Sequence, residues 1–146
     1  MEIAYDHDLP IIIHSRKLEK RCIELLDAHG QKRVDFHCYC GKTKYAVAAA
    51  EKHHNWKFSI PANIKRSESF QSMTKKLPIT SLLTETDAPY LSPTPGTRNE
   101  PANVVATVNE MAQLRGISEP EMAQTIWKNF SELFGKLQAN DQARKA

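Results

Sequence analysis

The chain has 146 residues, and its 20 Lys and Arg against 17 Asp and Glu leave a formal net charge of +3. This length accommodates one domain with a sizeable core and is too short for two ordinary domains. The small positive excess excludes a strongly basic protein that coats nucleic acid by charge alone. A hydrophobic fraction of 40% with charges of both signs excludes a disordered tail.

The sequence carries no pattern for targeting or membrane insertion. It has no run of about 18 apolar residues, so we expect no membrane span. Its first residues, MEIAYDHDLP, lack the basic region and apolar stretch of a secretory signal. Three cysteines give no disulfide framework, which favours a reducing, cytoplasmic location.

Four short apolar runs, each ending in polar residues, predict four strands. They cover residues 10–14, 34–37, 56–60 and 81–87 and recur about every 25 residues. Helical patterns lie between them at 15–29, 42–54 and 67–76, and two more follow at 104–115 and 118–134. Ser15 is expected to cap the first helix, and Gly135 to end the last one. Alternating strands and helices are typical of βαβ units on a parallel sheet.

The number of units predicts half of a larger fold. A complete TIM (β/α)₈ barrel has about 250 residues, so four units correspond to one half of it, here the C-terminal half. We expect residues 1–135 to form this half-barrel and the polar residues 136–146 to fray. Residues 2–9 look like the last turn of a preceding helix, which predicts further sequence upstream. The alternative is a small doubly wound sheet, but the glycine-rich turn typical of that fold is absent.

Three polar residues occupy equivalent places at the ends of predicted strands. His14 ends the first strand, His37 the second and Asp87 the fourth. Active sites of TIM barrels lie at the carboxyl ends of the strands, so these side chains are expected to converge. Two imidazoles and a carboxylate are suitable ligands for a divalent cation. A single histidine is more often an ordinary polar residue, but three such residues at equivalent positions favour a site.

Strand alternation adds two acidic residues to this group. If His37 and Asp87 point inward, Asp35 and Glu85 do too, one layer deeper. They could orient the metal ligands or accept a proton. Equally, they could pair with Arg16 or a lysine and only balance charge.

The cysteines suggest weaker alternatives. Cys38-x-Cys40 has no second ligand pair at zinc-site spacing. Cys38 as a nucleophile beside His37 is disfavoured, because adjacent strand residues point to opposite faces.

Several motifs resemble the TatD family of metal-dependent deoxyribonucleases, which belongs to the amidohydrolase-like TIM barrels. They are IIIHSR, FHCYCG, LLTETDAPYLSP, RNEP and NFSELFG, in this order between Leu9 and Gly135. The TETDAPYLSP block is the most specific of them. The resemblance implies a hydrolase that cleaves phosphodiester bonds in DNA with one or two divalent ions, for which Mg²⁺, Mn²⁺ and Zn²⁺ all remain open.

The resemblance also assigns roles to residues. His14, His37 and Asp87 would be metal ligands, and Asp87 would take a proton from the attacking water. Arg16, Arg98 and Asn99 would contact a phosphate, although Arg98 and Asn99 could instead hold their proline-rich loop.

The sequence departs from the family pattern in one major respect. The family's first strand carries an H-x-H pair, and a mid-chain strand carries a glutamate that bridges metals. This sequence contains no H-x-H. We therefore expect a fragment with an incomplete metal site, completed by a separate half-barrel or by self-association. The alternatives are an inactive half-barrel that self-associates or binds nucleic acid, and a related metal hydrolase with another substrate.

Overall fold

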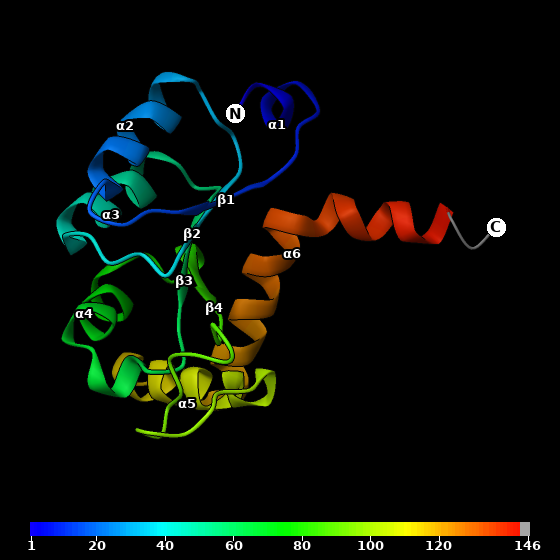
Figure 1. Ribbon diagram of the computed structural model, residues 1–146. Coiled ribbons are helices and arrows are strands. Elements are labelled where there is room, and N and C mark those ends of the chain that lie inside the picture. The colour runs from blue at the N-terminus through cyan, green and yellow to red at the C-terminus, as the bar shows by residue number, and fades with distance from the viewer. Residues whose placement is uncertain (144–146) are drawn as a thin grey trace.

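The computed structural model describes the backbone of residues 1–143 and the side chains of residues 1–135. Four parallel strands, β1 (Ile11–His14), β2 (Val34–His37), β3 (Trp56–Ile60) and β4 (Leu82–Thr84), lie side by side in sequence order (Figure 1). The register places His14 beside His37 and Ile60 beside Thr84. All carboxyl ends of the strands therefore meet at one rim, as in half of a (β/α)₈ barrel. The predicted α/β half-barrel is confirmed.

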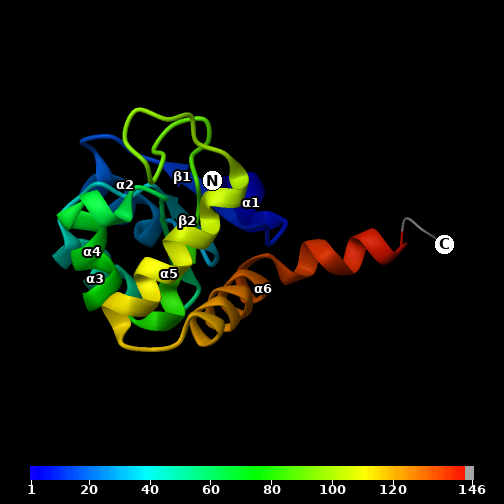
Figure 2. The same ribbon diagram turned by 90° about the horizontal axis from the view of Figure 1, so that it is seen from below.

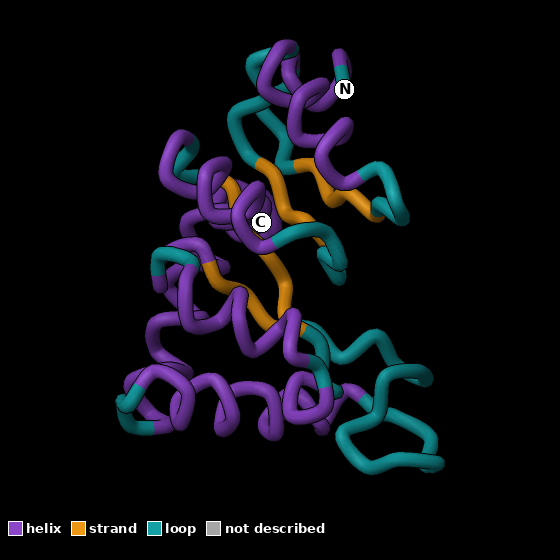
Figure 3. Tube along the Cα trace, turned by 90° about the vertical axis from the view of Figure 1, so that its left-hand side faces the viewer, coloured by secondary structure: helices purple, strands orange, loops and turns teal. Residues whose placement is uncertain are grey.

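Helices connect the strands and flank the sheet. They are α1 (Glu2–Asp6), α2 (Glu19–Ala28), α3 (Thr43–Lys52), α4 (Glu68–Lys76), α5 (Val104–Arg115) and α6 (Glu119–Ala143), with 3₁₀ turns η1 (Ile64–Arg66), η2 (Ile79–Ser81) and η3 (Pro101–Asn103). Seen from below, α3 and α4 lie on one side of the strands, and α6 runs outward on the other side (Figure 2). Figure 3 shows the longer loops gathered on the opposite side from most helices.

The core lies between the sheet and these helices. Phe36 and Phe58 stack with ring centroids 4.8 Å apart, and Trp56 lies 5.5 Å from Phe36. Val34 and Leu82 are also fully buried on this face. Alternation along β2 and β3 therefore directs these aromatic side chains outward to the helices, and Asp35, His37 and Ser59 toward the barrel interior.

Local sequence explains most of the helix boundaries. The Ser67 hydroxyl accepts a hydrogen bond from the backbone N–H of Phe70 at the start of α4. Ser118 accepts one from Glu121 at the start of α6, as its capping-box pattern predicts. Gly116 ends α5 with a φ of 67°, a left-handed conformation that glycine adopts without strain.

Two predicted helix boundaries are wrong. The helix expected from Ser15 begins at Glu19 instead, because Lys17 has a left-handed φ of 66° that bends the chain first. The last helix continues past Gly135 to Ala143. Gly135 is not among the residues with positive φ, and a glycine inside a helix costs only about 1 kcal/mol.

The end of the chain lies partly outside the described residues. The expected frayed tail covers 136–146; the backbone of residues 136–143 is helical, and residues 144–146 are not described. In the described part of the chain, no helix has the length and apolar character needed to cross a lipid bilayer.

Candidate metal site at the carboxyl ends of the strands

His37 is the centre of a polar cluster at the rim of the sheet. Its Nδ1 lies 2.5 Å from Glu85 Oε2, and its Nε2 lies 3.7 Å from Asp87 Oδ1. The ring of His14 follows on the neighbouring strand, with its centroid 5.6 Å from that of His37. The structure thus brings His14, His37, Glu85 and Asp87 to one place, although the two histidines lie 48 to 73 residues from the two acids in sequence.

Two residues at the rim have a left-handed backbone conformation. Cys38, directly after His37, has a φ of 46°, and Asp87 has a φ of 60°. Side chains other than glycine occupy this left-handed region at a cost, although Asp does so more readily than most residues. Strained residues of this kind are concentrated at functional sites.

Glu85 is held in an environment that disfavours its charge. Burial, the largest cause, and the nearby Asp35 and Asp87 carboxylates together raise the pKa of its carboxyl to about 9. Its Oε1 is buried and has no hydrogen-bond partner among the described residues. Glu85 and His37 are therefore joined by a proton shared between Oε2 and Nδ1 across their 2.5 Å contact.

Asp35 lies on the same inner face, one layer deeper. The hydroxyl of Ser59 on β3 donates to its two carboxylate oxygens at 2.8 and 3.0 Å. Burial raises the pKa of Asp35 to about 6. Glu85 thus contacts His37, and Asp35 contacts Ser59. These partners differ from the arginine or lysine that would be expected if the two acids only balanced charge.

The side chains at the rim are of the types that bind divalent cations, but they do not form a complete metal site. Imidazole nitrogens and a carboxylate are ligands for zinc, manganese and related ions. His37 Nε2 and Asp87 Oδ1 lie farther apart than a hydrogen bond, so neither atom is committed to the other. Over residues 1–135, however, no group of three or more His, Cys, Asp and Glu side chains has the arrangement of a complete metal site.

The loop after β4 is held by one buried side chain. Asn99 donates from Nδ2 to the carbonyls of Thr86 and Tyr90 at 2.7 and 2.6 Å. Its Oδ1 accepts from the backbone N–H of Glu100 and from Asn103 Nδ2. Asn99 is 2% exposed, so its hydrogen bonds support the loop-holding alternative over a phosphate contact.

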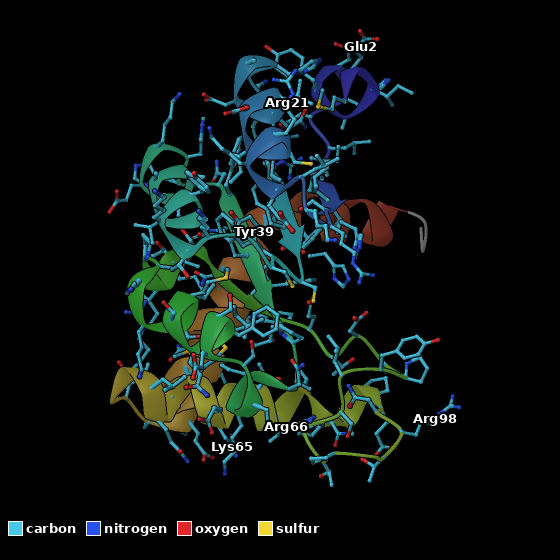
Figure 4. All side chains as sticks on the ribbon, turned by 60° about the vertical axis from the view of Figure 1, so that its left-hand side comes forward. Glu2, Arg21, Tyr39, Lys65, Arg66 and Arg98 are labelled. Carbon is cyan, nitrogen blue, oxygen red and sulfur yellow. The ribbon has the colours of Figure 1, made fainter. Side chains whose placement is uncertain are left out.

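The two predicted arginines lie outside the cluster. Arg98 points away from the body at the outer end of this loop (Figure 4), and Arg16 is exposed in the loop after β1. A third arginine that the motifs did not indicate, Arg66, donates to the carbonyl of Ser92 and joins η1 to the loop.

The other residue that sequence reasoning missed is Ser59. It lies two positions after the partner of Asp35 in the β2–β3 register, so it faces the same interior. Its place in strand 56–60 is the pattern that could have indicated it.

The thiol of Cys38 is half-buried. Burial, with nearby Cys40 and the acids, raises its pKa to about 12, which is in line with the expectation that Cys38 is not a nucleophile.

Four parallel βα units with imidazoles and carboxylates at their carboxyl ends define half of a metal-hydrolase-type barrel. Comparison with known proteins gives the family. A model of the family described as TatD related DNase matches residues 1–135, and the chain belongs to this family.

The relatives are about twice as long as the matched region. Human deoxyribonuclease TATDN3 is 36% identical over 137 residues, which cover 94% of this chain and 49% of that protein. The uncharacterized metal-dependent hydrolase MJ1582 of Methanocaldococcus jannaschii is 32% identical, over 92% of this chain and 52% of its own. The crystal structure of YjjV, a TatD homologue from Escherichia coli, superposes with a TM-score of 0.81 at 28% identity and covers 92% of this chain and 53% of that one. The chain thus spans about half the length of the curated relatives it matches.

Proposed function

We propose that this chain provides half of the catalytic site of a metal-dependent deoxyribonuclease, which cleaves phosphodiester bonds in DNA with a metal-activated water. The observation that carries the proposal is the position of His37 between Glu85 and Asp87 at the rim of the half-barrel. The names of TATDN3 and MJ1582 support a hydrolase of this kind. The complete activity belongs to a full barrel, in which the remaining ligands come from further βα units.

The described side chains have distinct roles in this site. His14, His37 and Asp87 would hold a divalent cation; Mg²⁺, Mn²⁺ and Zn²⁺ are all compatible with these ligands. When bound, the cation lowers the pKa of a water molecule and polarises the phosphoryl oxygen. Asp87, with 35% of its side chain exposed, is the base that takes the proton of the attacking water.

Glu85 and Asp35 position these groups. A cation held by His37 Nε2 would leave the ring proton on Nδ1, and Glu85 Oε2, 2.5 Å away, would accept that hydrogen bond as a carboxylate. That carboxylate then fixes the orientation of the ring. Ser59 holds Asp35 beneath this pair.

Phosphate binding falls to the exposed arginines. Arg16 and Arg98 lie in loops at the carboxyl ends of β1 and β4, where a DNA strand would cross the rim. Asn99 contributes indirectly, because it fixes the loop that carries Arg98.

The test uses the purified chain, alone and mixed with the half of YjjV that the chain does not match. Digestion of single-stranded DNA is followed during titration with Mn²⁺ or Zn²⁺. We expect Asp87→Asn and His37→Ala to lower the rate at least about 100-fold. His54→Ala is the control, because this exposed histidine precedes β3 at the opposite end of the strands. Absence of cleavage by the parent mixture with every ion would contradict the proposal.

A second candidate is a non-catalytic half-barrel that binds nucleic acid or self-associates. The open interior face of the sheet favours it, because Ile12 is 59% exposed there. A third is a related metal hydrolase with another substrate, which cleavage assays on amide and ester substrates would identify. The cytoplasmic location stays a prediction from cysteine use.

A further inference from the structure

A charged pocket opens between two consecutive βα units at the carboxyl ends of the strands. Its volume is about 460 Å³, and its walls come from the loop between β1 and α2, the first turns of α2, and the loop between β2 and α3. A larger hollow of about 530 Å³ lies between the sheet and α6, and the described residues that line the two have no member in common. The charged lining of the smaller pocket consists of Lys17, Glu19, Lys20, Arg21, Glu24 and Lys42.

Contacts within the chain hold the walls of this pocket together. A Cβ added to Gly41 would lie 2.5 Å from Tyr39 Oη and 2.8 Å from Glu19 Cβ, so the loop after β2 packs directly on α2. The Tyr39 hydroxyl donates to the carbonyl of Lys42 at 3.4 Å, and the backbone N–H of Lys17 donates to Glu19 Oε1 at 2.9 Å. Both walls belong to βα units that this chain contains, so no further unit is needed to form the pocket.

The charges in the pocket leave two lysines uncompensated. Glu24 lies 3.3 Å from Lys20 and 3.7 Å from Arg21, which pairs these three side chains with one another. Lys17 and Lys42 are exposed, and within residues 1–135 neither ammonium group forms an ion pair. Four cations against two carboxylates give the lining a net charge of +2. An anion that enters the pocket therefore meets a positive potential and two free ammonium groups.

The two free lysines lie close to the candidate metal site. Lys17 follows His14 by three residues, and Lys42 follows His37 by five. A chain segment spans at most about 3.6 Å per residue, so these pairs of Cα atoms are at most about 11 and 18 Å apart. All four residues lie at or directly after the carboxyl ends of β1 and β2. A polyanion bound at the rim can therefore extend from the metal site to both lysines.

We propose that this pocket binds phosphates of the DNA strand beyond the bond that is cleaved, with Lys17 and Lys42 as the phosphate contacts. Lysine ammonium groups neutralise phosphates without reading the bases, so we expect binding that is independent of sequence. The inference rests on the proposed function, because it assigns a path to the same substrate. It adds the side of the rim, above α2 and α3, along which the strand leaves the metal site.

Other anions fit the position of the pocket less well. Inorganic phosphate has the same chemistry as the strand but not the length to join the metal site to the pocket. An acidic peptide has the length, but nothing at the neighbouring metal site acts on it in the proposed reaction. A DNA strand carries a charge at every nucleotide and is the substrate of that site.

The experiment measures binding of a fluorescent single-stranded oligonucleotide to the full-length chain by anisotropy, with EDTA present to prevent cleavage. Lys17→Ala and Lys42→Ala are each expected to lower the slope of log affinity against log salt by about 0.7, and to raise the dissociation constant about five-fold at about 0.1 M salt. Lys42→Arg should keep the parental slope, because the charge remains. Lys76→Ala is the matched control, since this exposed lysine ends α4 at the opposite end of the strands.

A thiol in the pocket gives a second readout. Cys40 is exposed and lines the pocket, whereas Cys22 on α2 is outside it. The bound oligonucleotide is expected to slow alkylation of Cys40 and to leave that of Cys22 unchanged, as measured by peptide mass spectrometry. Inorganic phosphate and poly-glutamate, at the same concentration of anionic groups, should protect Cys40 less.

The outcomes separate this proposal from the nuclease activity. A parent that does not bind the oligonucleotide, parental salt slopes in both alanine variants, an unprotected Cys40, or equal protection by poly-glutamate would each overturn the phosphate pocket. Binding with the expected slopes but no cleavage with any metal ion supports the pocket and contradicts the proposed function alone.

Discussion

At the scale of single residues, Glu85 is the side chain on which the metal site depends most. Its Oε2 contacts His37 Nδ1 at 2.5 Å, and it is largely buried. Carboxylates in this position fix the ring orientation and tautomer of a metal-binding histidine. A change at Glu85 should therefore affect metal affinity without removing a ligand.

We expect Glu85→Ala to weaken Mn²⁺ or Zn²⁺ binding by about 10- to 100-fold, measured by titration calorimetry. Glu85→Gln should lose less, because its amide oxygen can still accept the proton of Nδ1. Glu51→Gln on the exposed side of α3 serves as the control. Equal affinity of the parent and Glu85→Ala would show that Glu85 does not orient His37.

The carboxyl group of Asp35, beneath the same rim, makes the free energy of unfolding depend on pH. Its folded-state pKa is raised to about 6 from 3.8 by burial, so the folded chain holds a proton that the unfolded chain has released. The stabilisation is fully present below pH 3.8 and is lost as pH rises through about 6. Glu85, raised to about 9, extends the same trend to alkaline pH.

Asp35→Asn should remove the acidic part of this trend. Relative to the parent, its free energy of unfolding should gain roughly 2 kcal/mol between pH 4 and pH 7. Urea unfolding at several pH values measures this difference. A parallel pH dependence in the parent and the variant would contradict the assignment to Asp35.

At the scale of elements, the sequence predicts where strands lie better than how loops are held. The runs 34–37 and 56–60 match β2 and β3 because both are bounded by polar residues and pack on helices. The bend at Lys17 depends on its backbone conformation, and no residue type in 15–18 indicates it. Whether Asn99 supports the loop or contacts a phosphate is decided by its four hydrogen-bond partners, which lie up to 13 residues away in sequence. The sequence does not indicate these partners.

Asn99 is accordingly expected to determine the order of the loop after β4. Asn99→Ala removes side-chain bonds to Thr86, Tyr90, Glu100 and Asn103 and should lower the free energy of unfolding by about 2 kcal/mol. It should also speed proteolytic cleavage between residues 88 and 98. Asn103→Ala, which removes one of these bonds, is the matched control and should have a smaller effect. Unchanged cleavage in Asn99→Ala would mean that other contacts hold the loop.

At the scale of the whole molecule, spacing alone predicts a half-barrel, because four strands recur at the interval of a βα unit. The same spacing predicts that His14, His37 and Asp87 share one rim. It does not predict the hollow interior, which depends on where α6 lies relative to the sheet. Phe130 belongs to the apolar pattern of the last predicted helix and looks like an ordinary core residue, yet it is 38% exposed, and the neighbouring Trp127 is 62% exposed.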